Sequence, residues 1–170
     1  MLDEAYVEFA DSPSLIAQLA AQPGLVVLRT LSKAYALAGA RCGALIAHRD
    51  VVALLRKVIQ PYAITQLTIE AVFRMLEPEA LNAARTRCAT LKSERSRVAA
   101  ALRTRAGVRR VWPSESNFLL VEFEDPRAAL ERTRAAGLLV RDLHAVPGLA
   151  QALRISIGSP EQNERLLAGL

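Results

Sequence analysis

Two short apolar runs, at 25–28 and 42–47, dominate the hydrophobic pattern of the first part of the chain. Runs of this length predict strands that are buried on both faces. Ahead of the first run, apolar residues recur every three or four positions, which predicts a helix with Ser12 as its N-cap and Pro13 in its first turn. Pro23 and Gly24 end that helix. A strand stub at the start of the chain, this helix and the run at 25–28 lie within about 25 residues, which predicts a parallel pair of strands with a crossover helix.

The middle of the chain has helical periodicity throughout. Helices are predicted over 51–59, capped by Asp50, and over 65–76. Pro78 interrupts the pattern, and a long helix then runs to about residue 105. Its apolar stripe consists of Leu81, Ala84, Cys88, Leu91, Val98 and Leu102. Arginines line much of the rest of this helix, and we expect them to form a solvated face.

Strands and helices alternate again beyond Gly107. Strands are predicted at 108–112, 118–123, 138–141 and 153–157. One helix is predicted from Asp125 to about 136, and another begins at the capping sequence Ser159-Pro160-Glu161 and runs to 170. This alternation predicts a small α/β lobe.

Composition narrows the class of protein. The 170 residues suffice for one domain or two small ones, and 52% of them are hydrophobic, which argues against disorder. The net charge of +5 comes mostly from arginines spread along the chain. A basic chain can bind an anionic ligand. Aromatic residues make up only 5% and do not interleave with basic clusters, which argues against nucleic-acid binding.

Cysteine and histidine usage points away from disulfides and metals. Cys42 and Cys88 are far apart, as expected of a reduced, cytoplasmic protein. His48 and His144 do not complete a metal-binding pattern with them. No signal-peptide pattern and no apolar run approaching the roughly 20 residues of a membrane span is present.

Side chains that could react with or bind a ligand are concentrated at 30–43, Thr-Leu-Ser-Lys-Ala-Tyr-Ala-Leu-Ala-Gly-Ala-Arg-Cys-Gly. Ser32 and Lys33 stand where the first buried strand should end. A neutral lysine amine can condense with an aldehyde cofactor. Ser32 and Arg41 can donate hydrogen bonds to a phosphate, Arg41 through a planar fork. The alternative interpretation is a surface lysine followed by a glycine-rich turn.

This segment resembles the cofactor-lysine segment of fold-type I pyridoxal 5'-phosphate (PLP) enzymes, and most closely that of histidinol-phosphate aminotransferases. Asp-Glu-Ala-Tyr at 3–6 and Leu-Arg-Ile at 153–155 extend the resemblance along essentially the whole chain. It implies an α/β fold of the aspartate aminotransferase-like PLP-transferase type, present in part, with a mostly parallel sheet remnant and a small C-terminal α/β lobe. The implied domains are the remainder of the large PLP-binding domain at 1–77, a linking helix at 78–106 and a small domain at 107–170.

The resemblance also implies roles in binding PLP. Lys33 would carry the cofactor and act as the catalytic base and acid. Asp3 would lie beside the pyridine nitrogen, Tyr6 would reach the phenolic oxygen of the ring, and Ser32 and Arg41 would hold the phosphate. Asp3 and Tyr6 can face one ligand only if the strand has ended before Tyr6. The alternative for Asp3 is a frayed polar terminus.

Three residues of the last part match substrate-binding positions of the family. Arg154 would bind the substrate carboxylate, and Arg141 would help to hold a substrate phosphate or carboxylate. Asn117 is a further candidate near the active site. Arg154 alternates with apolar neighbours, so it should point off the opposite face of its strand. The alternative for Arg141 is an exposed strand charge or a pair with Asp142.

The resemblance implies an aminotransferase that converts L-histidinol phosphate and 2-oxoglutarate to imidazole acetol phosphate and L-glutamate in histidine biosynthesis. The family forms homodimers. Its N-terminal part, absent from this sequence, supplies strands next to those predicted here, so we expect a C-terminal portion with exposed sheet edges. The alternatives are another fold-type I PLP enzyme, such as an aromatic aminotransferase or a phosphothreonine decarboxylase, and a non-catalytic fragment that needs a partner chain.

Overall fold

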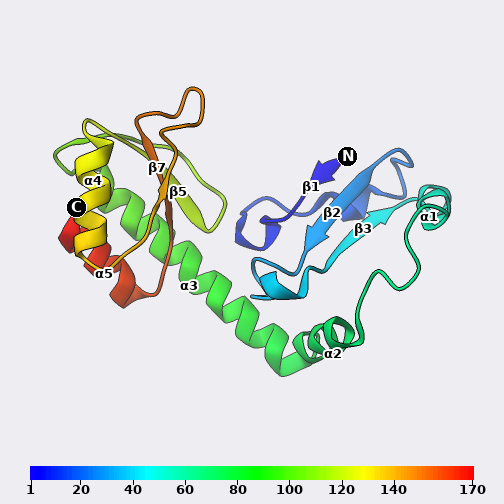
Figure 1. Ribbon diagram of the computed structural model, residues 1–170. Helices are drawn as coiled ribbons and strands as arrows, with labels where there is room; N and C mark the ends of the chain where they lie inside the picture. The colour runs from blue at the N-terminus through cyan, green and yellow to red at the C-terminus, as the bar shows by residue number, and fades with distance from the viewer. The chain divides into compact units, whose positions relative to one another are not determined.

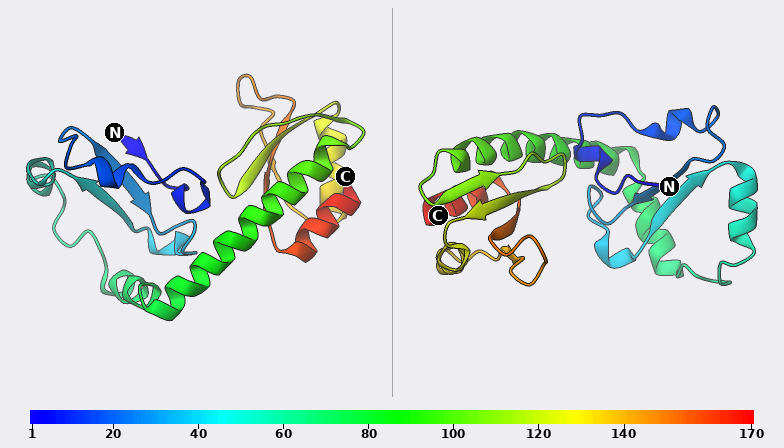
Figure 2. Two further views of the ribbon diagram at one scale, coloured as in Figure 1. Left: turned by 180° about the vertical axis from the view of Figure 1, so that it is seen from behind. Right: turned by 90° about the horizontal axis from the view of Figure 1, so that it is seen from above.

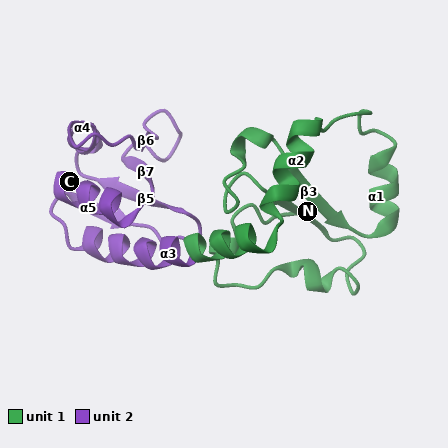
Figure 3. Cartoon of the chain, turned by 90° about the horizontal axis from the view of Figure 1, so that it is seen from below, with its two compact units in different colours: residues 1–88 green, residues 89–170 purple.

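The computed structural model describes residues 1–170, which form two structural units, 1–88 and 89–170 (Figure 3). Helix α3, Pro78–Arg103, contributes its first turns to unit 1 and the remainder to unit 2. Pro78 is the first residue of this helix, a position where its missing N–H costs no hydrogen bond. The long helix is therefore confirmed, while the division at 77 and 106 stays a prediction.

Unit 1 contains a three-stranded sheet with the order β1–β2–β3 (Figure 1). Its strands are β1 (Leu2–Asp3), β2 (Val26–Thr30) and β3 (Gly43–Ala47). β1 and β2 are parallel, as predicted, whereas β2 and β3 are antiparallel. The prediction of a mostly parallel sheet is wrong for this unit. The connection between β2 and β3 holds only the short 3-10 helix η3 (Ala38–Ala40), and no crossover helix returns the chain along the sheet.

The crossover between β1 and β2 also differs from the prediction of one helix. It contains two 3-10 helices, η1 (Val7–Phe9) and η2 (Leu15–Gln18). Ser14, and not Ser12, is the N-cap of η2, and its hydroxyl accepts a hydrogen bond from the backbone N–H of Ile16 at 3.1 Å. The same hydroxyl donates to the Glu4 carboxylate, and this tertiary contact fixes where the turn begins.

β3 is far less buried than its apolar sequence predicts, because its Gly43, Ala44 and Leu45 are exposed. The next elements are α1 (Arg49–Arg56) and α2 (Gln66–Met75), and neither has a buried residue. His48, and not Asp50, is the N-cap of α1, since its ring accepts from the backbone N–H of Asp50.

A set of large hydrophobic side chains on α1, on α2 and in the segment between and just after them is exposed in unit 1. We call this set the α1–α2 apolar surface: Leu54, Val58, Ile59, Tyr62, Ile64, Leu67, Ile69, Phe73 and Leu76. In unit 1 alone, these residues leave much apolar area in contact with water.

Unit 2 is an antiparallel sheet with helices on one face (Figure 2). The strands, in spatial order, are β4 (Val108–Val111), β5 (Phe118–Phe123), β7 (Ala152–Ser156) and β6 (Arg141–Asp142). The helices are the later part of α3, α4 (Pro126–Ala135) and α5 (Pro160–Gly169). The predicted lobe of strands and helices is present, and none of its strands is parallel to its neighbour.

Alternation along β5 shows which face of this sheet is covered. Leu119, Val121 and Phe123 are buried, and the residues between them are half-buried. The buried set joins Val98 and Leu102 of α3 in one hydrophobic core with α4 and α5. The other face of β5 carries the half-buried Phe118, Leu120 and Glu122. None of the helices combines the length and apolar character of a membrane-spanning segment.

Candidate active site

The candidate site of unit 1 lies at the carboxyl ends of β1 and β2. These parallel strands end at the same edge of the sheet, with Asp3 opposite Leu28. Lys33 follows three residues after the end of β2, in the loop that leads to η3. Its Nζ lies 5.4 Å from the centroid of the Tyr6 ring. The structure therefore brings Lys33 and Tyr6 together at the edge where β1 ends on Asp3.

β1 ends at Asp3, before Tyr6, which satisfies the condition for both side chains to serve one ligand. The carboxylate of Asp3 accepts a hydrogen bond from the backbone N–H of Ala5 at 2.9 Å. The backbone N–H of Glu4 donates to the carbonyl of Leu28 at 2.8 Å. This stretch is paired to β2, so a frayed terminus does not describe it.

Ser32 and Arg41 flank the lysine loop. The backbone N–H of Ser32 donates to the Thr30 hydroxyl at 3.1 Å, and the Ser32 side chain is half-buried. Arg41 is exposed, and its Nη1 donates to the carbonyl of Ala38 at 3.1 Å. A guanidinium has five N–H donors, so this bond leaves Arg41 others for an anion.

A charged network, which was not predicted from the sequence, connects the segment after β1 with β2 and the lysine loop. Glu4 is only 7% exposed, and its Oε2 accepts from Arg29 Nε at 2.9 Å. Arg29 Nη1 donates to Glu8 Oε1 at 3.0 Å, and the hydroxyl of Tyr35 donates to the same oxygen at 3.3 Å. Arg29 lies in the mainly apolar strand β2. A charged residue in such a strand usually has a partner of opposite charge, and this was the sequence signal that could have revealed the network.

Opposing effects set the protonation of this network. Burial disfavours the charged form of Glu4, but hydrogen bonds from Ser14 and Leu15 and the charge of Arg29 together lower its pKa below the ordinary glutamate value. Burial, followed by the nearby charge of Glu8, raises the pKa of Tyr35. Glu4 therefore stays ionised and Tyr35 stays protonated near neutral pH.

Two of the predicted substrate residues of unit 2 are cross-strand neighbours, since Arg141 of β6 lies opposite Arg154 of β7. Arg154 is exposed between the buried Leu153 and Ile155, as its alternation predicted. Its guanidinium lies 5.2 Å from the centroid of the Phe118 ring. Like charges placed opposite each other destabilise a sheet, and an anion bound between the two guanidinium groups would relieve that repulsion.

The other residues near these arginines have structural partners. The carboxylate of Asp142 accepts from the backbone N–H of His144 at 2.9 Å. The carbonyl of Asn117 accepts from the backbone N–H of Ile157 at 2.9 Å, which joins the start of β5 to the end of β7. The role of the Asn117 side chain in a binding site stays a prediction.

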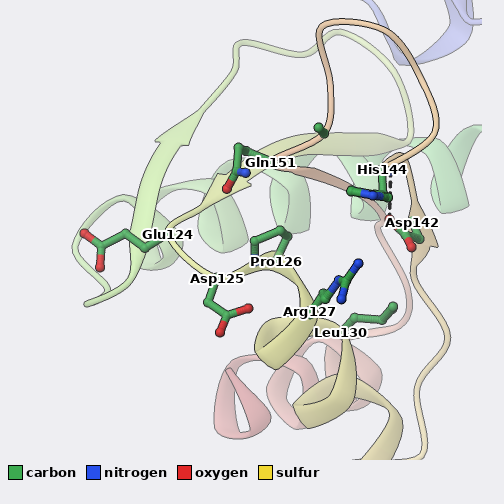
Figure 4. Close-up of a pocket in the computed structure, with 9 residues that line it drawn as sticks. Glu124, Asp125, Pro126, Arg127, Leu130, Asp142, His144 and Gln151 are labelled. Carbon is green, nitrogen blue, oxygen red and sulfur yellow. Dashed lines mark hydrogen bonds between the residues drawn. The ribbon is translucent and has the colours of Figure 1, made fainter.

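Unit 2 also has a pocket of about 360 Å³ at the start of α4 (Figure 4). Polar residues that line it include Glu124, Asp125, Arg127, Asp142 and His144. None of the residues predicted to bind a cofactor or a substrate lines this pocket.

Comparison with known proteins gives a consistent result. The family described as aminotransferase class I and II matches residues 1–170. The histidinol-phosphate aminotransferase of Xylella fastidiosa (strain 9a5c) is 50% identical over 170 residues, which are 100% of this chain and 47% of that protein. The enzyme of the same name from Stenotrophomonas maltophilia (strain R551-3) is 51% identical over the same shares. The chain thus spans about half the length of the curated relatives it matches.

Solved structures agree. The histidinol-phosphate aminotransferase of Sinorhizobium meliloti in complex with pyridoxal-5'-phosphate matches with a TM-score of 0.79 and 25% sequence identity. The match covers 98% of this chain and 46% of that one. The structural match therefore also extends over both units and over about half of the related chain.

Proposed function

The chain belongs to the class I and II aminotransferase family, and on this premise we propose that it forms part of a PLP-dependent aminotransferase. The proposed reaction converts L-histidinol phosphate and 2-oxoglutarate to imidazole acetol phosphate and L-glutamate. The proposal rests on one observation: about half of the residues of this chain, along its full length, are identical to those of curated histidinol-phosphate aminotransferases. The meeting of Lys33 and Tyr6 at the strand edge gives it a chemical basis.

The residues at this edge fit PLP. Lys33 is an exposed amine that can condense with the aldehyde of the cofactor. Asp3 supplies a carboxylate for the pyridine nitrogen, and Tyr6 a hydroxyl for the phenolic oxygen. Ser32 and Arg41 supply donors for the phosphate. When bound, PLP supplies an electron sink that stabilises negative charge at the α-carbon of the substrate.

Protein groups then move the proton and hold the substrate. Lys33 Nζ accepts the proton from the substrate α-carbon and later returns a proton, as general base and general acid. Arg154 and Arg141 hold the anionic groups of the substrate. Two cationic side chains suit a substrate that carries a phosphate or two carboxylates. Asn117 is proposed to contact the ligand from the start of β5.

The proposal is tested by covalent labelling at Lys33. The purified chain is titrated with PLP, reduced with borohydride and mapped by peptide mass spectrometry. We expect label on Lys33 and little on the other two lysines, Lys57 and Lys92, which act as internal controls. Lys33→Ala should remove the label. Equal labelling of all three lysines would contradict the proposed cofactor site.

Activity is a separate measurement. Transamination of L-histidinol phosphate with 2-oxoglutarate is compared with transamination of aromatic amino acids. Preference for L-histidinol phosphate supports the proposed substrate. Labelling of Lys33 without any transamination would leave a cofactor-binding chain that is catalytically incomplete.

We propose further that a second copy of the chain covers the α1–α2 apolar surface. Exposed apolar area of this extent usually marks an interaction site. A homodimer is also what the resemblance implies. If a different polypeptide covers the surface instead, the chain is a fragment that needs a partner, and self-association will not be found.

A further inference from the structure

Glu4 lies at the junction of three separate segments of unit 1. Its Oε2 accepts from the hydroxyl of Ser14 at 2.7 Å and from Arg29 Nε at 2.9 Å, and its Oε1 accepts from the backbone N–H of Leu15 at 2.8 Å. Its own backbone N–H is bonded to β2. Hydrogen bonds to an ionised carboxylate are shorter and stronger than neutral ones, so these donors hold the Glu4 side chain in place. Asp3, which directly precedes it, is therefore anchored.

The network continues from Glu4 to the lysine loop. Arg29 joins Glu4 to Glu8, and the hydroxyl of Tyr35 donates to Glu8. Tyr35 is two residues after Lys33. Within this loop, the backbone N–H of Ala36 donates to the carbonyl of Lys33 at 3.1 Å. The charged network thus ties the segment of Asp3 to the loop of Lys33.

The loop itself needs such an anchor. Ala36 has a φ of 57°, a conformation that costs free energy for any residue with a Cβ. Residues persist in this region only where their surroundings hold them there. The bond from Tyr35 to Glu8 is the polar contact that holds the residue next to Ala36 against the rest of unit 1.

We propose that Glu4 is a positioning residue of the active site, which acts through Arg29, Glu8 and Tyr35 to hold Asp3 and Lys33 at one distance from each other. This inference rests on the proposed function of Lys33. The binding of PLP should depend on Glu4, because PLP must contact Asp3 and Lys33 at the same time.

The test compares Glu4→Gln with Glu94→Gln. Glu94 of unit 2 is also buried, accepts from Arg97 and Asn163 and has a lowered pKa, so its variant controls for the loss of a buried carboxylate away from the site. Both are compared with the unchanged chain by amide hydrogen exchange without PLP and by PLP titration followed by reduction at Lys33.

We expect Glu4→Gln to raise the exchange rate of residues 31–37 and the dissociation constant of PLP by about tenfold each, the effect of losing one charge-assisted hydrogen bond. Glu94→Gln should change neither by more than about twofold. Tyr35→Phe, which removes only the bond to Glu8, should raise loop exchange in the same direction as Glu4→Gln.

The outcomes separate the two proposals. If the unchanged chain takes up no PLP at Lys33, the proposed function fails, and the exchange rates of residues 31–37 still decide the role of Glu4. If Glu4→Gln shows the same exchange rates at residues 31–37 and the same PLP uptake as Glu94→Gln, the positioning role is overturned. If Glu4→Gln does not fold, unchanged loop exchange in Tyr35→Phe would overturn it.

Discussion

Gly43 marks the closest approach between β2 and β3. A Cβ at this position would lie 2.6 Å from the backbone carbonyl oxygen of Arg29, and a backbone atom in a paired strand cannot move aside. Glycine is therefore required by tertiary packing here.

Gly43→Ala should lower the free energy of unfolding by about 1–3 kcal/mol, the usual cost of overpacking. Gly24→Ala is the control, because a Cβ there meets nothing within 4 Å. Chemical denaturation followed by circular dichroism measures both variants. Equal midpoints for the two variants would show that β3 moves away from β2 without cost.

Glu94 gives unit 2 a dependence on pH. Hydrogen bonds from Arg97 and Asn163 lower its pKa below the ordinary value near 4.5. A carboxyl whose pKa is lowered by folding contributes stability above its unfolded pKa. That stability is lost as the pH falls through the folded pKa.

We therefore expect the denaturation midpoint of the unchanged chain to fall as the pH drops from about 5 toward 3. Glu94→Gln should be less stable at pH 7 and should lose less stability on acidification. Glu131→Gln, an exposed change on α4, should follow the unchanged chain. The same slope with pH in both variants would exclude Glu94 as a source of the acid sensitivity.

At the scale of elements, local signals identified most strands and helices. The strand predicted at 118–123 is β5, and the predicted helix at 65–76 is α2 with each end shifted by one residue. The helix predicted after Ser12 was wrong, because the contacts of Ser14 and Leu15 with Glu4 replace it with a 3-10 turn. A tertiary contact with a residue about ten positions away outweighed the local helical pattern.

The predicted N-terminus of α5 is confirmed as a capping box. The Ser159 hydroxyl accepts from the backbone N–H of Gln162, and the Gln162 side chain accepts from the backbone N–H of Ser159. Ser159→Ala should cost about 1 kcal/mol of stability, since it leaves a helix N–H without its partner.

Ser96→Ala is the matched control for that change. The Ser96 hydroxyl donates to the carbonyl of Lys92 within α3, a bond that does not favour the helix, so its removal should be neutral or slightly stabilising. Urea denaturation measures the difference. A loss in Ser96→Ala as large as that in Ser159→Ala would contradict the capping argument.

At the scale of the whole molecule, the two units differ in how completely they bury their apolar residues. Unit 2 has a core of strands and three helices around Leu102, Val121 and Ile155. In unit 1, α1 and α2 have no buried residue. A second chain that covers the α1–α2 apolar surface would supply the missing burial.

Phe73→Glu should reduce self-association of the chain by at least tenfold, because the 67% exposed ring would contribute about 2 kcal/mol or more when buried. Leu139→Glu changes a 91% exposed apolar residue of unit 2 and should leave association unchanged. Analytical ultracentrifugation over a range of concentrations measures both. An unchanged chain that stays monomeric would contradict the proposed homodimer.

The sequence by itself determined the order of the elements, the family resemblance and the candidate residues around Lys33. These depend on local hydrophobic pattern and on contiguous motifs. The sequence could also place Arg154 on the uncovered face of its strand, because alternation is a local property.

Only the tertiary structure decided the antiparallel direction of β3, the cross-strand pairing of Arg141 with Arg154, and the network that links Glu4 to Arg29 across 25 positions. The physical reason is that strand direction and ionic pairing depend on which distant segments meet. Hydrophobic periodicity records whether a side chain is buried, but it does not record the partner against which it is buried.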